Sequence, residues 1–185
     1  DNDGDLDAFT ATLETMDRPE GAEIVLNNGD GTFSLAPLDQ HNLQVTGRPI
    51  NRGGAAFVDV DRDGHVDLWI GRSNGPNGPE QDNLYKGGGD GSFASITSKW
   101  GLTTEPWQFL NDLNMARAHT NSWGVHACDL TNDGWPELLS ASYGRAPNHL
   151  WYASDAGGAR TYVNESMNSG YAFDDRQDWT DNESA

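Results

Sequence analysis

Carboxylate side chains crowd the segment FVDVDRDGHVDLWIG, residues 57–71. Asp59, Asp61, Asp63 and Asp67 would repel one another strongly if all four were ionised and close together. A bound cation would remove this conflict, because Ca²⁺ takes roughly six to eight oxygen ligands from carboxylates, carbonyls and water. The first chemistry that this segment indicates is therefore the binding of a hard cation.

The spacing Asp-x-Asp-x-Asp-Gly-x-x-Asp suits such a site. The three alternate aspartates can curl around one centre, Gly64 permits the sharp turn, and the carbonyl of His65 can point inward. Asp67 then closes the shell from the start of the next strand. Ligation by oxygen alone argues against zinc, which prefers His and Cys, and Mg²⁺ accepts few protein ligands. We therefore predict calcium.

The acidic loop recurs along the chain. DNDGDLD (1–7) and DLTNDGWPE (129–137) resemble it, and the aligned glycines Gly4, Gly64 and Gly134 are 60 and 70 residues apart. Self-similarity at such intervals is the signature of a repeat architecture.

A second signal accompanies the first two loops at a constant distance. Asp30, in LNNGDGTF, follows Asp3 by 27 residues, and Asp90, in KGGGDGSF, follows Asp63 by the same 27. The third copy is degenerate, with Asp155 22 residues after Asp133. We expect Asp30 and Asp90 to serve hairpin turns rather than metals, because Asp-Gly is a favoured turn pair.

The three loops predict two to three calcium ions. The loops differ in how complete their sets of ligands are. The alignment places the leading ligand of the first loop two residues before Asp1. In the third loop a threonine removes one charge and a glutamate is longer, so we expect weaker or water-assisted binding there. The predicted ligands are Asp1, Asp3, Asp5 (carbonyl) and Asp7; Asp59, Asp61, Asp63, His65 (carbonyl) and Asp67; and Asp129, Thr131, Asp133, Trp135 (carbonyl) and Glu137.

An EF-hand loop begins in the same way, but it needs an acidic residue at position twelve and a helix on either side. Position twelve is Ile70 in the second loop and Ser140 in the third. The flanking residues alternate at period two, as in VDLWIG, which is typical of strands. The EF-hand interpretation therefore fails.

Four short antiparallel strands per repeat predict an all-β fold made of β-propeller blades. About three blades form an arc or fragment of a larger ring, because propellers have roughly four to eight. Trp123 and Trp151 are expected in the core between blades, and Thr104 is expected to cap a helix with Trp107, Leu110 and Leu113 on one stripe. The predicted units are 1–50, a blade lacking its first strand; 51–102, a blade with the complete loop; 103–121, a helical inter-blade insertion; 122–170, a blade with a degenerate loop; and 171–185, the start of a further blade or an acidic tail.

The amino-acid composition argues against several kinds of partner and of structure. A formal net charge of −18 argues against a nucleic-acid partner and against adhesion to anionic lipid. Seven tryptophans argue against disorder, although the hydrophobic fraction is only 35%. Cys128 is the single cysteine, so an internal disulfide is excluded. We find no apolar run near the roughly 18 residues of a membrane span, so no membrane insertion is expected.

The segments FVDVDRDGHVDLWIG, NLYKGGGDGSF and WGVHACDLTNDGWPELLSASYG resemble the FG-GAP/VCBS repeats of integrin-like β-propellers, particularly those related to cartilage acidic protein. The resemblance implies that calcium braces the loop between the first two strands of each blade, usually in a seven-bladed ring.

We therefore expect a calcium-binding, non-enzymatic propeller segment of an extracellular or cell-surface protein, used in adhesion, ligand binding or assembly. Its ligand would be a protein or a glycan of unknown identity. One alternative is the propeller part of a secreted enzyme acting on polysaccharide, which a cleft-facing set of acids outside the loops would favour. Another is a self-assembling filament or coat subunit that associates through open blade edges, which sedimentation would reveal.

Overall fold

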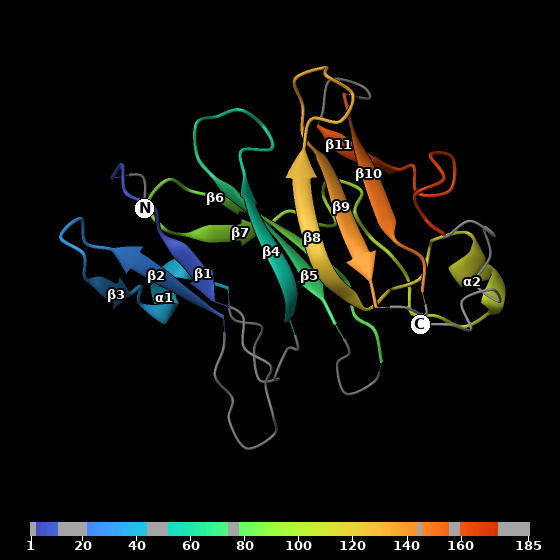
Figure 1. Ribbon diagram of the computed structural model, residues 1–185, viewed down its shortest axis with the longest axis horizontal. Coiled ribbons are helices and arrows are strands. Elements are labelled where there is room, and N and C mark those ends of the chain that lie inside the picture. The colour runs from blue at the N-terminus through green and yellow to red at the C-terminus, as the bar shows by residue number, and fades with distance from the viewer. Residues whose placement is uncertain are drawn as a thin grey trace.

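The computed structural model describes residues 3–10, 22–43, 52–73, 78–143, 146–155 and 160–173. These residues form three antiparallel sheets, which lie side by side in Figure 1 and do not close into a ring. The all-β class and the four-stranded blades predicted from the sequence are confirmed. The strands are β1 (Ala8–Thr10), β2 (Glu23–Asn27) and β3 (Phe33–Leu35); β4 (Arg52–Val58), β5 (Asp67–Arg72), β6 (Asn83–Gly87) and β7 (Phe93–Ser95); and β8 (Ser122–Cys128), β9 (Glu137–Ser142), β10 (His149–Ser154) and β11 (Thr161–Asn164).

Strand register shows how the three sheets correspond. Leu68 of β5 lies opposite Tyr85 of β6, and Ala8 of β1 lies opposite Val25 of β2 in the same relation. Strand β1 is therefore the counterpart of β5 and not of β4. In the described residues the first sheet has the order β1-β2-β3, so the outer side of β1 is an open edge.

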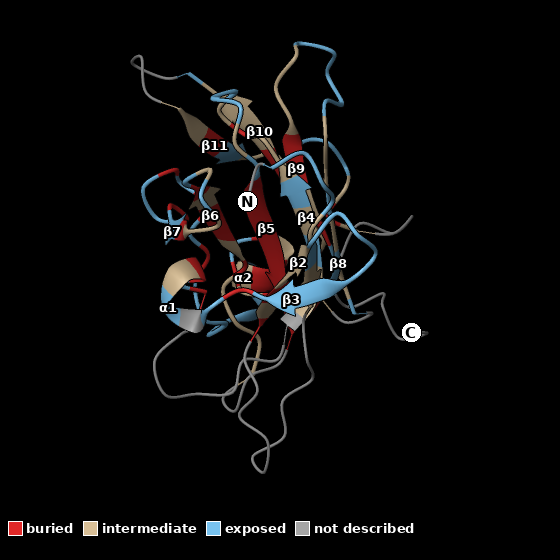
Figure 2. Ribbon diagram, turned by 90° about the vertical axis from the view of Figure 1, so that its left-hand side faces the viewer, coloured by how far each residue is buried: buried red, intermediate tan, exposed pale blue. Residues whose placement is uncertain are grey.

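The core consists of two apolar layers, one between each pair of neighbouring sheets. Trp69 packs in the layer between the second and third sheets, whereas Leu68 and Ile70 pack in the layer between the first and second. Strand β5 is consequently buried along its whole length (Figure 2). The period-two pattern of VDLWIG predicts a strand correctly. It does not reveal that both faces are covered, because that depends on the neighbouring sheets.

The segment 103–120 is mostly not helical, contrary to the prediction. Helix α2 covers only Leu110–Asn114, and Trp107 is exposed. Thr104 does not cap it, because its hydroxyl bonds to Gln81 and His119. A bridge between Glu105 and Ala118 closes the segment into a loop, so long-range backbone bonds replace helical ones.

Both helices found in the described residues are short. Helix α1 covers Leu38–His41, one turn that follows β3. Within the part of the chain that the structure describes, no helix is long and apolar enough to cross a membrane.

The two tryptophans expected between blades differ in position. Trp151 is buried, as predicted, but Trp123 is 60% exposed and stacks on Tyr143 with ring centroids 4.8 Å apart. The pairing of β8 with β9 shifts between Ser122 and Gly124, so Trp123 is the extra residue of a bulge. A bulge redirects a side chain, which is why the alternation of the strand mispredicts this one.

Replacing Trp69 should be the most damaging change in the core. Its side chain is fully buried and its Nε1–H donates to the carbonyl of Leu139 in the next sheet, at 3.1 Å. We expect Trp69→Ala to lower the free energy of unfolding by about 3–5 kcal/mol in urea titrations. Trp107→Ala, at a side chain 54% exposed, should cost less than about 1 kcal/mol. Equal losses would contradict this two-layer core.

Candidate metal centre

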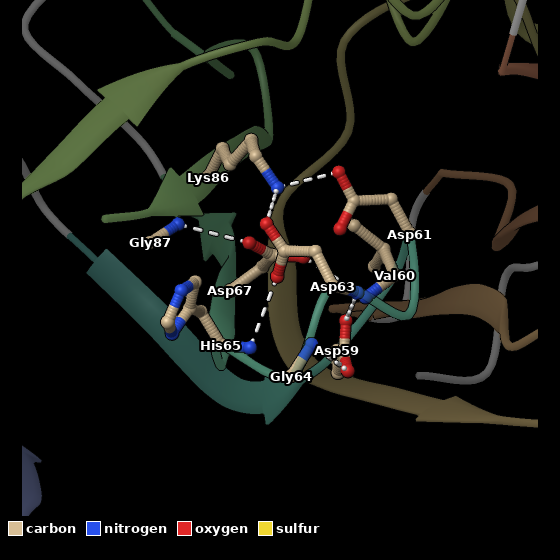
Figure 3. A network of polar contacts seen from close by, with 9 residues as sticks. All are labelled: Asp59, Val60, Asp61, Asp63, Gly64, His65, Asp67, Lys86 and Gly87. Carbon is tan, nitrogen blue, oxygen red and sulfur yellow. Dashed lines mark hydrogen bonds and ion pairs between the residues drawn. The ribbon is translucent and has the colours of Figure 1, made fainter. Parts of the chain in front are cut away.

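The acidic loop between β4 and β5 is folded by its own carboxylates. Asp59 accepts backbone N–H bonds from Asp63 and Gly64, at 3.2 and 3.0 Å, and Asp63 accepts one from His65 at 3.0 Å (Figure 3). Gly64 has a φ of 88°, which a side chain would strain. These bonds curl the loop. The carboxylate of Asp63, predicted as a ligand, pairs with Lys86 and is not among the oxygens that converge with those of Asp59 and Asp61.

Asp67 lies deeper than its neighbours and has a bracing role that the sequence does not indicate. Its fully buried carboxylate accepts N–H bonds from Val60 and from Gly87 of β6, both at 2.9 Å. Burial raises the pKa of Asp67 to about 6, although these two bonds oppose the rise. One side chain thus connects the end of β4, the start of β5 and the end of β6.

Three of the predicted ligands converge in the second loop. Asp59, Asp61 and Asp67 each contribute a carboxylate oxygen, and these oxygens lie within 4.8 Å of one another. The Oδ1 atom of Asp61 is buried and has no hydrogen-bond partner. An orphaned buried carboxylate oxygen within an all-oxygen donor set fits a hard cation such as Ca²⁺.

The ammonium group of Lys86, on β6, lies against this cluster and was not anticipated from the sequence. Its Nζ is 2.5 Å from Asp61 Oδ2 and 2.6 Å from Asp63 Oδ2 (Figure 3). Partial burial lowers the pKa of Lys86, but the bonds to the two carboxylates raise it by more than burial lowers it. The pKa therefore lies above its usual value. The same contact lowers the pKa of Asp63.

Within the described residues, a lysine ammonium group lies against the second loop only. The register of β6 with its counterparts puts Leu26 and Tyr152 at the position of Lys86. One sequence signal could have indicated this contact, because Lys86 is one of two lysines in an acidic chain and precedes the paired hairpin motif.

The third loop, between β8 and β9, repeats the bonds of the second. Asp129 accepts from the N–H groups of Asp133 and Gly134, at 3.1 and 2.8 Å, and Asp133 accepts from that of Trp135 at 2.8 Å. The buried Glu137 accepts from Leu130 at 2.6 Å and from Thr131 at 3.3 Å. The loop keeps its shape with Thr131 and Glu137 present.

The carboxylates of Glu137 and Asp67 differ in the segments of the chain that they bond to. The bonds that Glu137 accepts from Leu130 and Thr131 stay within its own loop and use one oxygen, Oε2, whereas Asp67 also accepts a bond from β6. Burial raises the pKa of Glu137, opposed by those backbone bonds. Among the described residues, three acidic ligand atoms converge in the second loop only. The weaker third site therefore stays a prediction.

The first loop is described from Asp3 onward, so the placement of Asp1 lies outside the described residues. Asp3 accepts an N–H bond from Asp5 at 3.0 Å, as Asp63 does from His65. Asp7 accepts one from Asn27 of β2 at 2.9 Å, which corresponds to the bond between Asp67 and Gly87.

The constant 27-residue offset has a structural cause. The side chains of Asp5 and His65, at equivalent positions, pack against Gly29 and Gly89 of the paired hairpins so closely that a Cβ there would lie 2.8 and 2.3 Å from them. Each acidic loop therefore lies beside the hairpin of its own blade. Asp90 accepts bonds from the N–H and hydroxyl of Ser92, which gives it the turn role predicted for it.

Trp135, expected to offer its carbonyl, also forms a contact between loops. Two guanidinium groups lie over its ring, with Cζ of Arg62 in the second loop 4.2 Å and Cζ of Arg160 3.4 Å from the ring centroid. The positions of the carbonyls of Asp5, His65 and Trp135 relative to an ion stay predictions.

Blade-like sheets with an acidic loop after the first strand define a repeat protein of the β-propeller type. The chain matches the model of the FG-GAP-like repeat over residues 1–70 and 59–140, and the two matches overlap on the second acidic loop. Because these matches cover most of the chain, it belongs to the FG-GAP-like repeat family. Repeats of this family often bind calcium and are typical of extracellular proteins. No curated protein matches the chain.

Lys86→Met should separate the two roles of the acidic cluster. Without the ammonium, calcium no longer competes with an internal cation, so we expect about tenfold tighter binding at the second loop, equivalent to roughly 1.4 kcal/mol. In chelator the same variant should be less stable than the parent chain, because Asp61 and Asp63 lose their counter-ion. Isothermal titration and urea unfolding measure the two effects.

Lys99→Met is the matched control, since it removes the exposed second lysine and the same charge. If both variants changed calcium affinity equally, the effect would be one of net charge and not of the Lys86 contact.

Proposed function

We propose that this chain is a calcium-stabilised propeller segment of an extracellular or cell-surface protein, and that it presents a rigid binding face rather than catalysing a reaction. The observation that carries the proposal is the second loop. There Asp59, Asp61 and Asp67 bring oxygens within 4.8 Å of one another, and a buried oxygen of Asp61 has no partner.

The mechanism we propose is rigidification of one rim of the molecule. An ion held by Asp59 and Asp61 after β4, and by Asp67 at the start of β5, would fasten the ends of two strands. Asp67 would extend the effect to β6 through its bond to Gly87. The second and third acidic loops lie at the same end of their sheets (Figure 1), so ions in both would stiffen a shared surface.

The size of the effect follows from binding linkage. A site with a Kd of about 0.1 mM, typical of extracellular calcium modules, contributes roughly 1.4 kcal/mol when free calcium is about ten times that Kd. Two or three such sites would be a substantial part of a typical stability of about 5–15 kcal/mol. Sites this weak function where calcium is abundant, which supports the extracellular location. A protein or a glycan remains the expected ligand.

The non-enzymatic part of the proposal rests on how the acids are used. The carboxylates of Asp59, Asp67 and Glu137 accept backbone N–H bonds inside the loops, so they shape the loops that contain them. A general acid or base would instead face a substrate cleft.

Calcium should raise the melting temperature relative to chelator by about 3–6 °C for each occupied site. Asp61→Asn should remove the second loop's share of this rise, because it removes the charge of the orphaned ligand but no backbone bond in the loop. Asp90→Asn, at an exposed aspartate in the neighbouring hairpin, should keep the full rise. Equal melting temperatures with calcium and with chelator would refute the calcium mechanism.

A further inference from the structure

The second and third acidic loops touch each other through one side chain, that of Arg62. The Cζ atom of its guanidinium group lies 4.2 Å from the centroid of the Trp135 ring in the third loop. A Cβ placed on Gly134 would lie only 2.0 Å from Nη2 of Arg62. At Gly64, the equivalent glycine of the second loop, no atom of the described residues lies within 4 Å of such a Cβ, apart from its neighbours in the chain. The third loop is therefore covered by a residue of the blade before it.

The backbone of Arg62 has an unfavourable conformation for an arginine. Its φ is 60°, in the left-handed region, where asparagine is a more usual residue. Asn132, at the equivalent position of the third loop, has a φ of 58°, and the first loop has Asn2 at this position. An arginine here costs backbone free energy relative to an asparagine. Residues held in such conformations are concentrated at functional sites, so the strain indicates a role for the side chain.

The two acidic neighbours of Arg62 in the sequence are engaged by another cation. Asp61 and Asp63 are both paired with Lys86, at 2.5 and 2.6 Å (Figure 3). The guanidinium group of Arg62 lies instead over an indole ring, where the electron-rich face attracts a cation. Arg62 thus has its backbone in the second loop and its charged group on the third.

The part of the third loop that Arg62 covers is bonded to two predicted ligands. The N–H group of Gly134 donates to Asp129 at 2.8 Å, and that of Trp135 donates to Asp133 at 2.8 Å. The carbonyl of Trp135 is itself a predicted ligand. A contact that fixes Gly134 and Trp135 therefore also fixes ligands of the third site.

We propose that Arg62 couples the two calcium sites, so that an ion in the second loop strengthens calcium binding in the third. This inference rests on the proposed calcium function. An ion held by Asp59 and Asp61 would fix the chain at Arg62, and the guanidinium group would then hold Trp135 in place. The third loop would lose less conformational freedom when its own ion binds, and a site that is already ordered binds more tightly.

The coupling has a defined sign and acts equally in both directions. Each site changes the affinity of the other by the same factor, because the two binding equilibria are linked. Direct repulsion between two Ca²⁺ ions would have the opposite sign, since it weakens both sites. Mutual strengthening is therefore the signature of the contact between the loops. We expect a factor of about five, at the lower end of typical coupling between sites.

Calcium titration followed by NMR measures the two sites separately, because the amides of Gly64 and Gly134 each donate to a predicted ligand of their own loop. Asp61→Asn disables the second site, and we expect it to weaken calcium binding at Gly134 about fivefold. Glu137→Gln disables the third site and should weaken binding at Gly64 by the same factor. In the variant Arg62→Asn both sites should still bind calcium, but Asp61→Asn should no longer affect Gly134.

Asparagine suits this test because the third loop has it at the equivalent position, so the left-handed backbone is kept. Loss of the positive charge of Arg62 should tighten both sites, but this effect cancels in the ratio of affinities that measures the coupling. Arg160→Asn is the matched control. It removes the other guanidinium group from the Trp135 ring, 3.4 Å from the centroid, but Arg160 belongs to the third blade. The coupling should persist in that variant.

Hydrogen exchange provides a second measurement that needs no ion in the third loop. Glu137→Gln removes a charged ligand there, while its side-chain oxygen can still accept the N–H bonds of Leu130 and Thr131. In this variant, calcium bound to the second loop alone should slow exchange of the Gly134 amide. Adding Arg62→Asn should abolish the slowing.

Three outcomes decide the matter. An effect of Asp61→Asn on Gly134 that disappears with Arg62→Asn and persists with Arg160→Asn supports the coupling. Calcium binding in both loops without that effect, or with an effect that Arg62→Asn leaves intact or that Arg160→Asn removes equally, overturns the coupling and leaves the calcium function standing. The absence of any calcium response at Gly64 would refute the calcium function itself, and the coupling with it.

Discussion

The buried carboxylate of Asp67 is the constraint on which the blade depends. It accepts N–H bonds from Val60 and Gly87, so it fastens the acidic loop to β6 while it offers an oxygen to the aspartate cluster. Burial favours its neutral form, yet the adjacent Lys86 and a bound cation both favour the charged form. If calcium binds there as proposed, the ion would keep this buried carboxylate in its charged form.

Repetition extends this arrangement across the molecule. Asp7 makes the bond to Asn27 that Asp67 makes to Gly87, and Glu137 keeps the bond to the loop backbone in the third blade. Backbone N–H bonds to aspartate side chains recur in all three loops, although their ligand sets differ. Among the described residues, Lys86 adds a lysine ammonium group to the second loop alone, so the proposed calcium sites need not share one affinity.

Much of the fold could be predicted because repeats carry redundant information. The acidic loops, the hairpin offset and the strand pattern each appear more than once, and the structure explains the offset by contact between His65 and Gly89. The failures occurred where long-range bonds or an irregular strand register override the local sequence pattern. The helix expected over 103–120 shortens to α2 because Glu105 bonds across to His119, and Trp123 turns outward at a bulge.

The sequence by itself determined the repeat, the strands and the oxygen-rich loops, because ligand spacing and period-two alternation are local properties of a chain. Only the tertiary structure decided that β5 is buried on both faces, that Lys86 faces Asp61, and that Trp123 turns outward at a bulge. These features come from pairing and packing between segments distant in the sequence. The local sequence pattern of a strand does not indicate which other strand it will pair with or pack against.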